Sequence, residues 1–198
     1  DVYLYTKPAV HINDLKIQAL LDDSLTKGEL KIDIQSQGRG TIQMILSEMP
    51  LYRFPGSAVT DLGEAANKEV AKAEFSLSDG SGKLTLPLEG MKLWSAEEPN
   101  LYELLLTVTN EQGHITEVVA SGVGFRRFEM KNHIMCLNGK RIVFKGVNRH
   151  EFSSIAGRVP QPAELLQDII TMKRNNINAI RTCHYPNDSP LYNFCDVY

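Results

Sequence analysis

Two short segments in the last third of the chain carry the side chains best suited to bind or transform a ligand. One covers residues 148–152 (Asn-Arg-His-Glu-Phe) and the other covers residues 181–187 (Arg-Thr-Cys-His-Tyr-Pro-Asn). Each lies where a predicted strand ends, and the carboxyl ends of parallel strands meet along one edge of a sheet. Basic side chains gathered at such an edge are costly to bury without acidic or hydroxyl-rich partners. We therefore expect His150, Arg181 and His184 to line a binding site.

Other chemistries fit these segments less well. The pair His150-Glu151 begins as a zinc-binding HExxH motif would, but Ser154 stands where the second histidine is required, so we expect no metal site here. A single carboxylate beside a histidine more often orients its neighbour than acts as a general acid, and we assign Glu151 that orienting role. Arg149 is expected to brace the fold and not to touch a substrate.

The cysteines and the single tryptophan are interpreted as structural residues. Cys136, Cys183 and Cys195 form no CxxC pair, and their odd number argues against a disulfide framework. We expect all three to be reduced and buried, with a catalytic thiol at Cys183 as the alternative because His184 follows it. Trp94 offers a ring on which a sugar could stack, but a lone tryptophan beside a sandwich strand is more often a packing anchor.

A predicted strand-helix-strand unit positions the two segments. Short extended runs are predicted at residues 128–130, 133–137, 141–145 and 178–182. The dipeptide Asn138-Gly139 indicates a hairpin turn, and a loop is predicted over residues 146–159. Pro162 and Glu164 suit the first turn of a helix whose apolar residues recur at spacings of three and four. Strand, helix and strand together indicate a βαβ unit, and hence parallel strands.

The longer first part of the chain reads as strands. Apolar and polar residues alternate with a period of two, as in Leu30, Ile32 and Ile34, and about seven such runs lie between residues 15 and 123. Strands with one apolar face bury it by stacking two antiparallel sheets, which indicates an immunoglobulin-like sandwich. Pro87 cannot donate a hydrogen bond to a neighbouring strand, so its strand is expected at a sheet edge.

The predicted fold class is therefore mainly β: an immunoglobulin-like antiparallel β-sandwich, then a β-hairpin and the first βαβ unit of an incomplete (β/α)8 barrel. The predicted domains are a leading segment at residues 1–11, the sandwich at 12–124 and the barrel start at 125–198. A complete barrel needs about 250 residues, so we expect a segment of a larger polypeptide. The open edge of its parallel sheet should make the isolated chain self-associate, or fray after about residue 140.

Composition excludes several classes of protein. The 198 residues are 42% hydrophobic and 23% charged, which is typical of a soluble folded protein and not of a disordered one. A formal net charge of -3 provides no basic surface for nucleic acid or acidic lipid. No apolar stretch approaches the roughly 20 residues that span a bilayer. We therefore expect a cytoplasmic protein that binds neither nucleic acid nor membrane.

Several segments carry a family resemblance. They are residues 93–95, 99–102 and 122–126 in and after the predicted sandwich, and residues 146–151, 178–186, 191–192 and 196 in the predicted barrel start. Together they closely resemble glycoside hydrolase family 2, and specifically its β-galactosidases, over nearly the whole chain. Arg149 favours the galactosidases of this family, because a lysine is typical at this place in its glucuronidases.

The resemblance implies a retaining β-glycosidase that hydrolyses terminal β-galactosides of the lactose type. Two glutamates perform the reaction in such enzymes, and the resemblance places both on later barrel strands, outside this chain. Arg181 is similar to the arginine that hydrogen-bonds the nucleophile, and His150 and His184 are similar to histidines that hold sugar hydroxyls and stabilise the transition state. A homo-oligomeric parent enzyme with magnesium and sodium as cofactors is also implied, with no cofactor bound by this segment.

Two alternatives remain open. The chain is either inactive alone as part of such an enzyme, or a non-catalytic sandwich module that binds carbohydrate or a protein partner. Within the family, a β-glucuronide or a β-mannoside is the alternative substrate.

Overall fold

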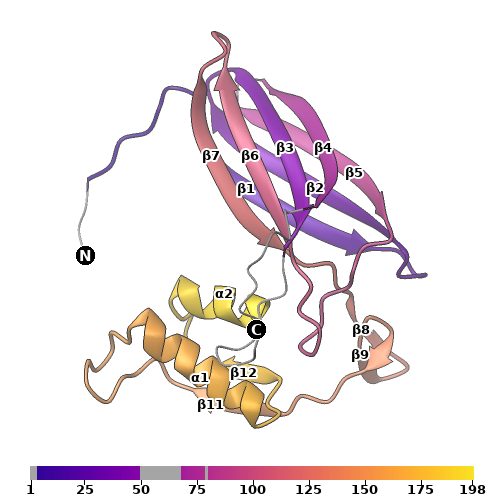
Figure 1. Cartoon of the computed structure of the whole chain (residues 1–198), viewed down its shortest axis with the longest axis vertical. Helices are drawn as coiled ribbons and strands as arrows, with labels where there is room; N and C mark the ends of the chain where they lie inside the picture. The colour runs from indigo at the N-terminus through magenta and orange to yellow at the C-terminus, as the bar shows by residue number, and fades with distance from the viewer. Residues whose placement is uncertain (1–3, 50–67, 79) are drawn as a thin grey trace. The chain divides into compact units, whose positions relative to one another are not determined.

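The computed structural model describes residues 4–49, 68–78 and 80–198 of the chain. Residues 1–3 of the predicted leading segment, and residues 50–67 and 79 of the predicted sandwich, lie outside the described residues. The chain divides into two compact units. The first holds the described residues before Leu93 together with Leu101–Arg126, and the second holds Leu93–Asn100 and Arg127–Tyr198. Figure 1 colours the chain by residue number, from indigo at the N-terminus to yellow at the C-terminus.

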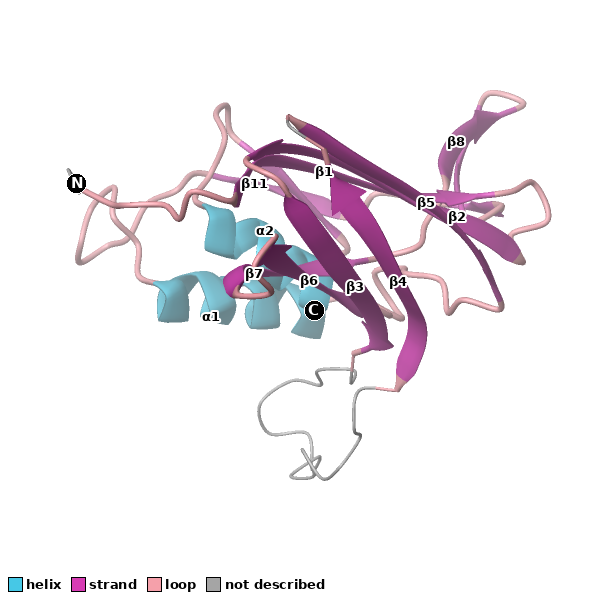
Figure 2. Cartoon of the chain, turned by 90° about the horizontal axis from the view of Figure 1, so that it is seen from above, coloured by secondary structure: helices cyan, strands magenta, loops and turns pink. Residues whose placement is uncertain are grey.

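The first unit is a sandwich of antiparallel strands, as predicted. Its strands are β1 (His11–Leu21), β2 (Lys27–Gln37), β3 (Gly40–Glu48), β4 (Glu69–Leu77), β5 (Ser81–Glu89), β6 (Tyr102–Asn110) and β7 (Ile115–Val123). One sheet has the order β1-β2-β5 and the other has the order β4-β3-β6-β7, and Figure 2 draws the strands of both in magenta. The sheet order places β5 at an edge, which confirms the prediction made from Pro87.

The core of the sandwich follows directly from the alternation of the sequence. Leu30, Ile32 and Ile34 of β2 are buried, and so are Ile42, Met44 and Leu46 of β3 and Leu104, Leu106 and Val108 of β6. Burying each of these larger side chains contributes about 1.5–3 kcal/mol, so the two inner faces together hold the sheets against each other.

Two details of the sandwich depend on backbone geometry. Strand β1 begins at His11, earlier than the predicted run from Leu15, because a bulge between Ile12 and Asp14 shifts the register and interrupts the alternation. Strand β3 begins at Gly40, where an added Cβ would lie 2.1 Å from the carbonyl oxygen of Thr109 on β6. Only a glycine allows the two backbones to approach this closely.

The second unit begins with a hairpin and continues as a strand-helix-strand unit. Its elements are β8 (Phe128–Lys131), β9 (Ile134–Leu137), β10 (Lys140–Arg141), β11 (Gly146–Arg149), α1 (Pro162–Arg174), β12 (Ala179–Thr182) and α2 (Ser189–Val197). Asn138 and Gly139 both have positive φ angles in the turn between β9 and β10, as the Asn-Gly signal predicted. Strands β11 and β12 pair in parallel, so the fold class inferred from the sequence is confirmed.

Two features of this unit differ from the prediction. The expected strand at residues 141–145 is reduced to β10, and the parallel strand is β11, which falls in the predicted loop over 146–159. The sequence of β11 shows no apolar alternation, because its buried residue is Arg149. Helix α2 over Ser189–Val197 was not predicted from the sequence. Asp188 caps that helix by accepting a hydrogen bond from the backbone N–H of Ser189.

The two helices of the second unit share a small apolar core. Leu165 and Ile169 of α1 and Leu191 of α2 are buried, and Ile180 of β12 and Phe194 of α2 pack against them. Helix α1 begins at Pro162, as predicted, and ends at Arg174, with Asn175 as its C-cap. Among the described residues, no helix is both long and apolar enough to cross a membrane.

Residues Leu93–Asn100 belong to the second unit although they lie between β5 and β6 in the chain. The indole Nε1 of Trp94 donates to the carbonyl oxygen of Asp196 at 2.7 Å, and its own carbonyl accepts from Asn138 Nδ2 at 3.0 Å. The ammonium of Lys173 donates to the carbonyl oxygen of Ala96. These contacts join the segment to the hairpin and to both helices, and they confirm Trp94 as an anchor.

Candidate functional site

The candidate site lies where β11 and β12 end. The parallel register sets Asn148 opposite Arg181 and Arg149 opposite Thr182. Because alternate residues of a strand point to opposite faces, Asn148 and Arg181 share one face of this two-stranded sheet, and Arg149 and Thr182 share the other. His150 follows the last residue of β11, and His184 follows β12 by two residues. The structure therefore brings both chemical segments to one edge, as the strand-end argument predicted.

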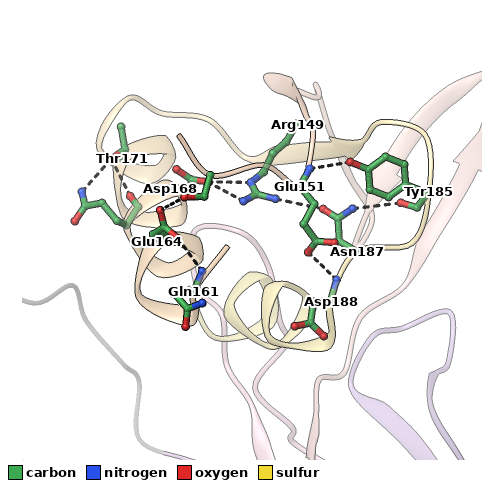
Figure 3. Close-up of polar contacts among 11 residues, drawn as sticks. Arg149, Glu151, Gln161, Glu164, Asp168, Thr171, Tyr185, Asn187 and Asp188 are labelled. Atoms are coloured by element: carbon green, nitrogen blue, oxygen red, sulfur yellow. Dashed lines mark hydrogen bonds and ion pairs between the residues drawn. The ribbon is translucent and has the colours of Figure 1, made fainter. Parts of the chain in front are cut away.

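Arg149 is a buried structural cation. Its side chain is 6% exposed, and its Nε and Nη2 lie 3.0 Å and 2.9 Å from the same carboxylate oxygen of Asp168 on α1. Its Nη1 donates to Asn187 Oδ1 at 3.3 Å, as Figure 3 shows. The Arg149 carbonyl oxygen also accepts from the backbone N–H of Cys183 at 2.9 Å. The guanidinium thus joins β11, α1 and the loop after β12, which confirms the bracing role.

Glu151 links the two loops of the site to each other. Its Oε1 accepts a hydrogen bond from the backbone N–H of Asp188 at 2.8 Å, and its own backbone N–H donates to the Tyr185 hydroxyl at 3.0 Å. Both contacts are drawn in Figure 3. In the first contact the donor lies in the loop after β12, and in the second it lies in the loop after β11. The Glu151 carboxylate is hydrogen-bonded as expected, but its partner is the backbone N–H of Asp188, so orientation of a neighbouring histidine by Glu151 stays a prediction.

The two predicted histidines lie next to each other. The ring centroids of His150 and His184 are 6.1 Å apart with an interplanar angle of 78°, an edge-to-face arrangement. The Tyr185 ring lies 6.1 Å from His150, and its hydroxyl is 3.5 Å from His150 Nδ1. All three side chains are exposed, so their polar atoms are available to a ligand.

Arg181 is held by its own strand and not by the histidines. Its side chain is exposed, and its Nη1 lies 3.6 Å from the Sγ of Cys183. Within the part of the chain that the structure describes, no contact joins the guanidinium to His150 or His184. It is therefore an exposed cation on the strand that leads into the His184 loop.

Two of the three cysteines match the expectation of burial. Cys136 and Cys183 are buried, but Cys195 on α2 is only partly so. Burial raises the pKa of the Cys195 thiol to about 11, the negative charge of Asp196 acts in the same direction, and the Arg149 cation opposes both. Cys195 escapes full burial because it lies in the short helix α2, where only Leu191 is buried.

The start of α1 is fixed by an acidic residue. Glu164 accepts hydrogen bonds from the Ser153 hydroxyl at 2.7 Å and from the backbone N–H of Gln161 at 2.8 Å. These two donors hold the pKa of the Glu164 carboxyl below its ordinary value. Asp168 lies one turn further along the helix, so this cap also sets the position of the Arg149 partner.

Metal chemistry has no support from these side chains. No group of three or more histidine, cysteine, aspartate and glutamate residues that could hold a metal ion occurs among the residues described. The two carboxylates near the site that could ligate a metal, those of Glu151 and Glu164, already accept hydrogen bonds from backbone N–H groups. The magnesium and sodium implied by the resemblance, and the expectation that this segment binds no cofactor, stay predictions.

Tyr185, Asp168 and Asn187 contribute to the site although sequence reasoning gave them no role. Tyr185 and Asn187 lie in the second chemical segment, and their polarity beside a predicted strand was the available signal. Asp168 carried no local signal, because its partner Arg149 lies nineteen residues earlier in the chain.

The chain matches two models of one protein family. The model described as "Glycosyl hydrolases family 2" matches residues 10–126, and the model described as "Glycosyl hydrolases family 2, TIM barrel domain" matches residues 128–198. A beta-galactosidase of Halalkalibacterium halodurans is 43% identical over the whole chain, which covers 18% of that protein. One of Clostridium acetobutylicum is 42% identical, also over the whole chain, and the match covers 20% of its length. The chain thus spans about a fifth of the curated relatives it matches.

Solved structures show the same fold. A beta-glucuronidase of Parabacteroides merdae superposes with a TM-score of 0.80 at 22% identity, covering 96% of this chain and 23% of that one. Beta-glucuronidase 3 of Bacteroides uniformis gives a TM-score of 0.80 at 24% identity, covering 96% of this chain and 22% of its own.

Proposed function

The chain belongs to glycosyl hydrolase family 2, and from this premise we propose that it is part of a retaining β-galactosidase and forms one side of its sugar pocket. The observation that carries the proposal is the edge-to-face pair of His150 and His184 at the carboxyl ends of two parallel strands, the second of which carries Arg181. Ligands bind at this end of the strands in barrels of alternating strands and helices. The beta-galactosidases that match the whole chain support galactose as the sugar.

Each of the three side chains has a physical role in this proposal. Retaining hydrolysis needs one carboxylic acid to protonate the leaving oxygen and one carboxylate to attack the anomeric carbon. The resemblance places both glutamates in other parts of the enzyme, and Glu151 and Glu164 near the site are engaged in structural contacts. Arg181 donates to the attacking carboxylate, which keeps that group ionised and oriented. His150 and His184 hold sugar hydroxyls as positive charge develops on the ring.

The geometry of Arg149 supports a galactosidase over a glucuronidase of the same family. Two of its nitrogens converge on Asp168 while a third reaches Asn187. A lysine, which is expected at this place in the glucuronidases, is a point charge and cannot make this forked set of contacts.

Two measurements on the enzyme test the proposal. The 198-residue chain alone should not hydrolyse a chromogenic β-galactoside, whereas the full-length enzyme should. In the full-length enzyme, Arg181→Ala should lower kcat by about a hundredfold, as expected for loss of one transition-state donor, with little change in stability. Arg174→Ala, an exposed arginine in the last turn of α1, serves as the matched control. Turnover by the pure chain, or equal rates for the two variants, would overturn these roles.

The substrate and the alternative functions are tested separately. Full-length enzyme is assayed with the β-galactoside, β-glucuronide and β-mannoside of one chromophore, and a higher kcat/KM for either of the last two refutes galactose. Calorimetric titration of the 198-residue chain with galactose or lactose should show almost no binding. A measurable affinity would instead support a carbohydrate-binding module. The cytoplasmic location and the homo-oligomeric state stay predictions.

A further inference from the structure

The hydroxyl of Tyr185 makes two contacts that connect the loops of the site. It accepts a hydrogen bond from the backbone N–H of Glu151 at 3.0 Å, and it lies 3.5 Å from Nδ1 of His150. The Glu151 side chain in turn accepts a hydrogen bond from the backbone N–H of Asp188 at 2.8 Å. The backbone N–H of Glu151 therefore fixes the Tyr185 hydroxyl at a position close to His150 Nδ1.

The direction of these hydrogen bonds follows from counting protons. A phenol carries one hydrogen and can also accept. The contact with Glu151 uses it as an acceptor, because a backbone N–H can only donate. Its own hydrogen can then be donated to His150 Nδ1, the other polar atom that its hydroxyl meets among the described residues, in the tautomer that leaves this nitrogen unprotonated. A neutral histidine that accepts at Nδ1 carries its proton on Nε2.

Orientation of this histidine matters for the transition state. The edge-to-face contact with His184 places the two rings but leaves each free to turn about its own axis. A hydrogen bond at Nδ1 removes that freedom for His150 and leaves Nε2–H as a donor of known position. The distance of 3.5 Å is long, and such contacts commonly shorten when substrate is bound.

We propose that Tyr185 is a positioning residue that orients His150 and holds its proton on Nε2, so that this nitrogen donates to a hydroxyl of the bound sugar. The inference rests on the proposed function, because it names how one residue of that same pocket is held. Tyr185 itself is not assigned a contact with the sugar.

Tyr192 provides a matched control for the test. Its hydroxyl also accepts a backbone N–H, that of Asn187 at 2.8 Å, and its side chain is similarly exposed, but it makes no contact with His150. Tyr185→Phe and Tyr192→Phe therefore each remove one hydroxyl that accepts from a backbone N–H, that of Glu151 after β11 and that of Asn187 after β12 respectively. Only the first removes the partner of the histidine.

The first measurement needs no activity. Amide hydrogen exchange is followed by mass spectrometry with single-residue fragmentation on the full-length enzyme, where Tyr185→Phe should speed exchange of the Glu151 amide by about tenfold. Tyr192→Phe should leave the Glu151 amide unchanged and affect the Asn187 amide. If the Glu151 amide exchanges at the same rate in all three proteins, the hydroxyl contact does not exist and the proposal is overturned.

The second measurement is a double-mutant cycle in the full-length enzyme with a chromogenic β-galactoside. Tyr185→Phe should lower kcat about five- to tenfold, the equivalent of one hydrogen bond, with a smaller change in KM. Tyr192→Phe should change kcat by less than about twofold. In a His150→Gln background, Tyr185→Phe should have no further effect, because its partner is already gone.

An equal loss of kcat in both backgrounds, or an equal loss from the Tyr192 variant, would show that Tyr185 does not act through His150. Failure of the proposed function gives a different result: the wild-type full-length enzyme then hydrolyses no β-galactoside. In that case the cycle is run on the β-glycoside that it does hydrolyse, and the exchange measurement still decides whether the contact is present.

Discussion

Replacing Asp168 with alanine should destabilise the second unit by leaving a buried cation without its partner. The Arg149 side chain is 6% exposed, while that of Asp168 is 47% exposed. Breaking a fully buried ion pair costs roughly 3–5 kcal/mol. Because water can reach the Asp168 side, we expect about half of that cost, or about 2 kcal/mol. The remaining partner, Asn187, is a single neutral acceptor at 3.3 Å and cannot compensate for the lost charge.

Urea unfolding of the 198-residue chain measures this loss. The chain has one tryptophan, and Trp94 belongs to the second unit, where its indole bonds to Asp196 at 2.7 Å. Its fluorescence therefore reports on this unit. With a urea m-value of about 1.5 kcal/mol/M, the midpoint should fall by about 1.3 M.

Two further variants make the result decisive. Asp168→Asn keeps an acceptor oxygen and loses only the charge, so its midpoint should lie between those of wild type and Asp168→Ala. Gln167→Ala, the exposed neighbour on α1, should stay within about 0.5 kcal/mol of wild type. If Asp168→Ala moves the midpoint no further than Gln167→Ala does, then Asp168 does not hold Arg149 and the bracing network is wrong.

Two other predictions follow from the described contacts. The ordinary thiol value of 9.0 applies to Cys195 in the unfolded chain, whereas its pKa is about 11 in the folded chain. Between pH 9 and 11 the unfolded chain thus loses a proton that the folded chain keeps, so stability falls with rising pH. Urea midpoints at pH 8 and 10.5 should show a smaller decline in Cys195→Ala, and an identical decline would contradict this. In the sandwich, Gly40→Ala forces a Cβ against Thr109 and should lower the melting temperature by several degrees, measured by far-UV circular dichroism. Gly122→Ala, with nothing within 4 Å of its added Cβ, is the control and should melt close to wild type.

The sandwich was predictable because the pattern of buried and exposed side chains is visible in consecutive residues of each strand. Strand β2 places Leu30, Ile32 and Ile34 inside and polar residues between them, so the period of two is visible locally. The edge position of β5 was predictable for a similar reason, since Pro87 lacks the N–H that a central strand requires. In both cases the physical cause lies within a few residues of the signal.

The barrel segment was less predictable because its stabilising contacts are not local. Strand β11 buries an arginine, and that burial is possible only because Asp168 and Asn187 arrive from later elements. Helix α2 did carry a start signal, Asp188 followed by Pro190, but it is too short for its apolar period to stand out. The meeting of His150 and His184 followed from strand direction alone, whereas the contacts of Tyr185 depend on loop conformations that no spacing encodes.

The segment Leu93–Asn100 has a consequence for how such a gene can be rearranged. It is encoded between two strands of one unit but contributes its contacts, through Trp94 and Ala96, to the other. A crossover near the codon for Arg126 would carry Arg127–Tyr198 into a new gene without the loop that anchors it. Functional shuffling of this barrel start therefore requires that the preceding sandwich be inherited with it as a single block.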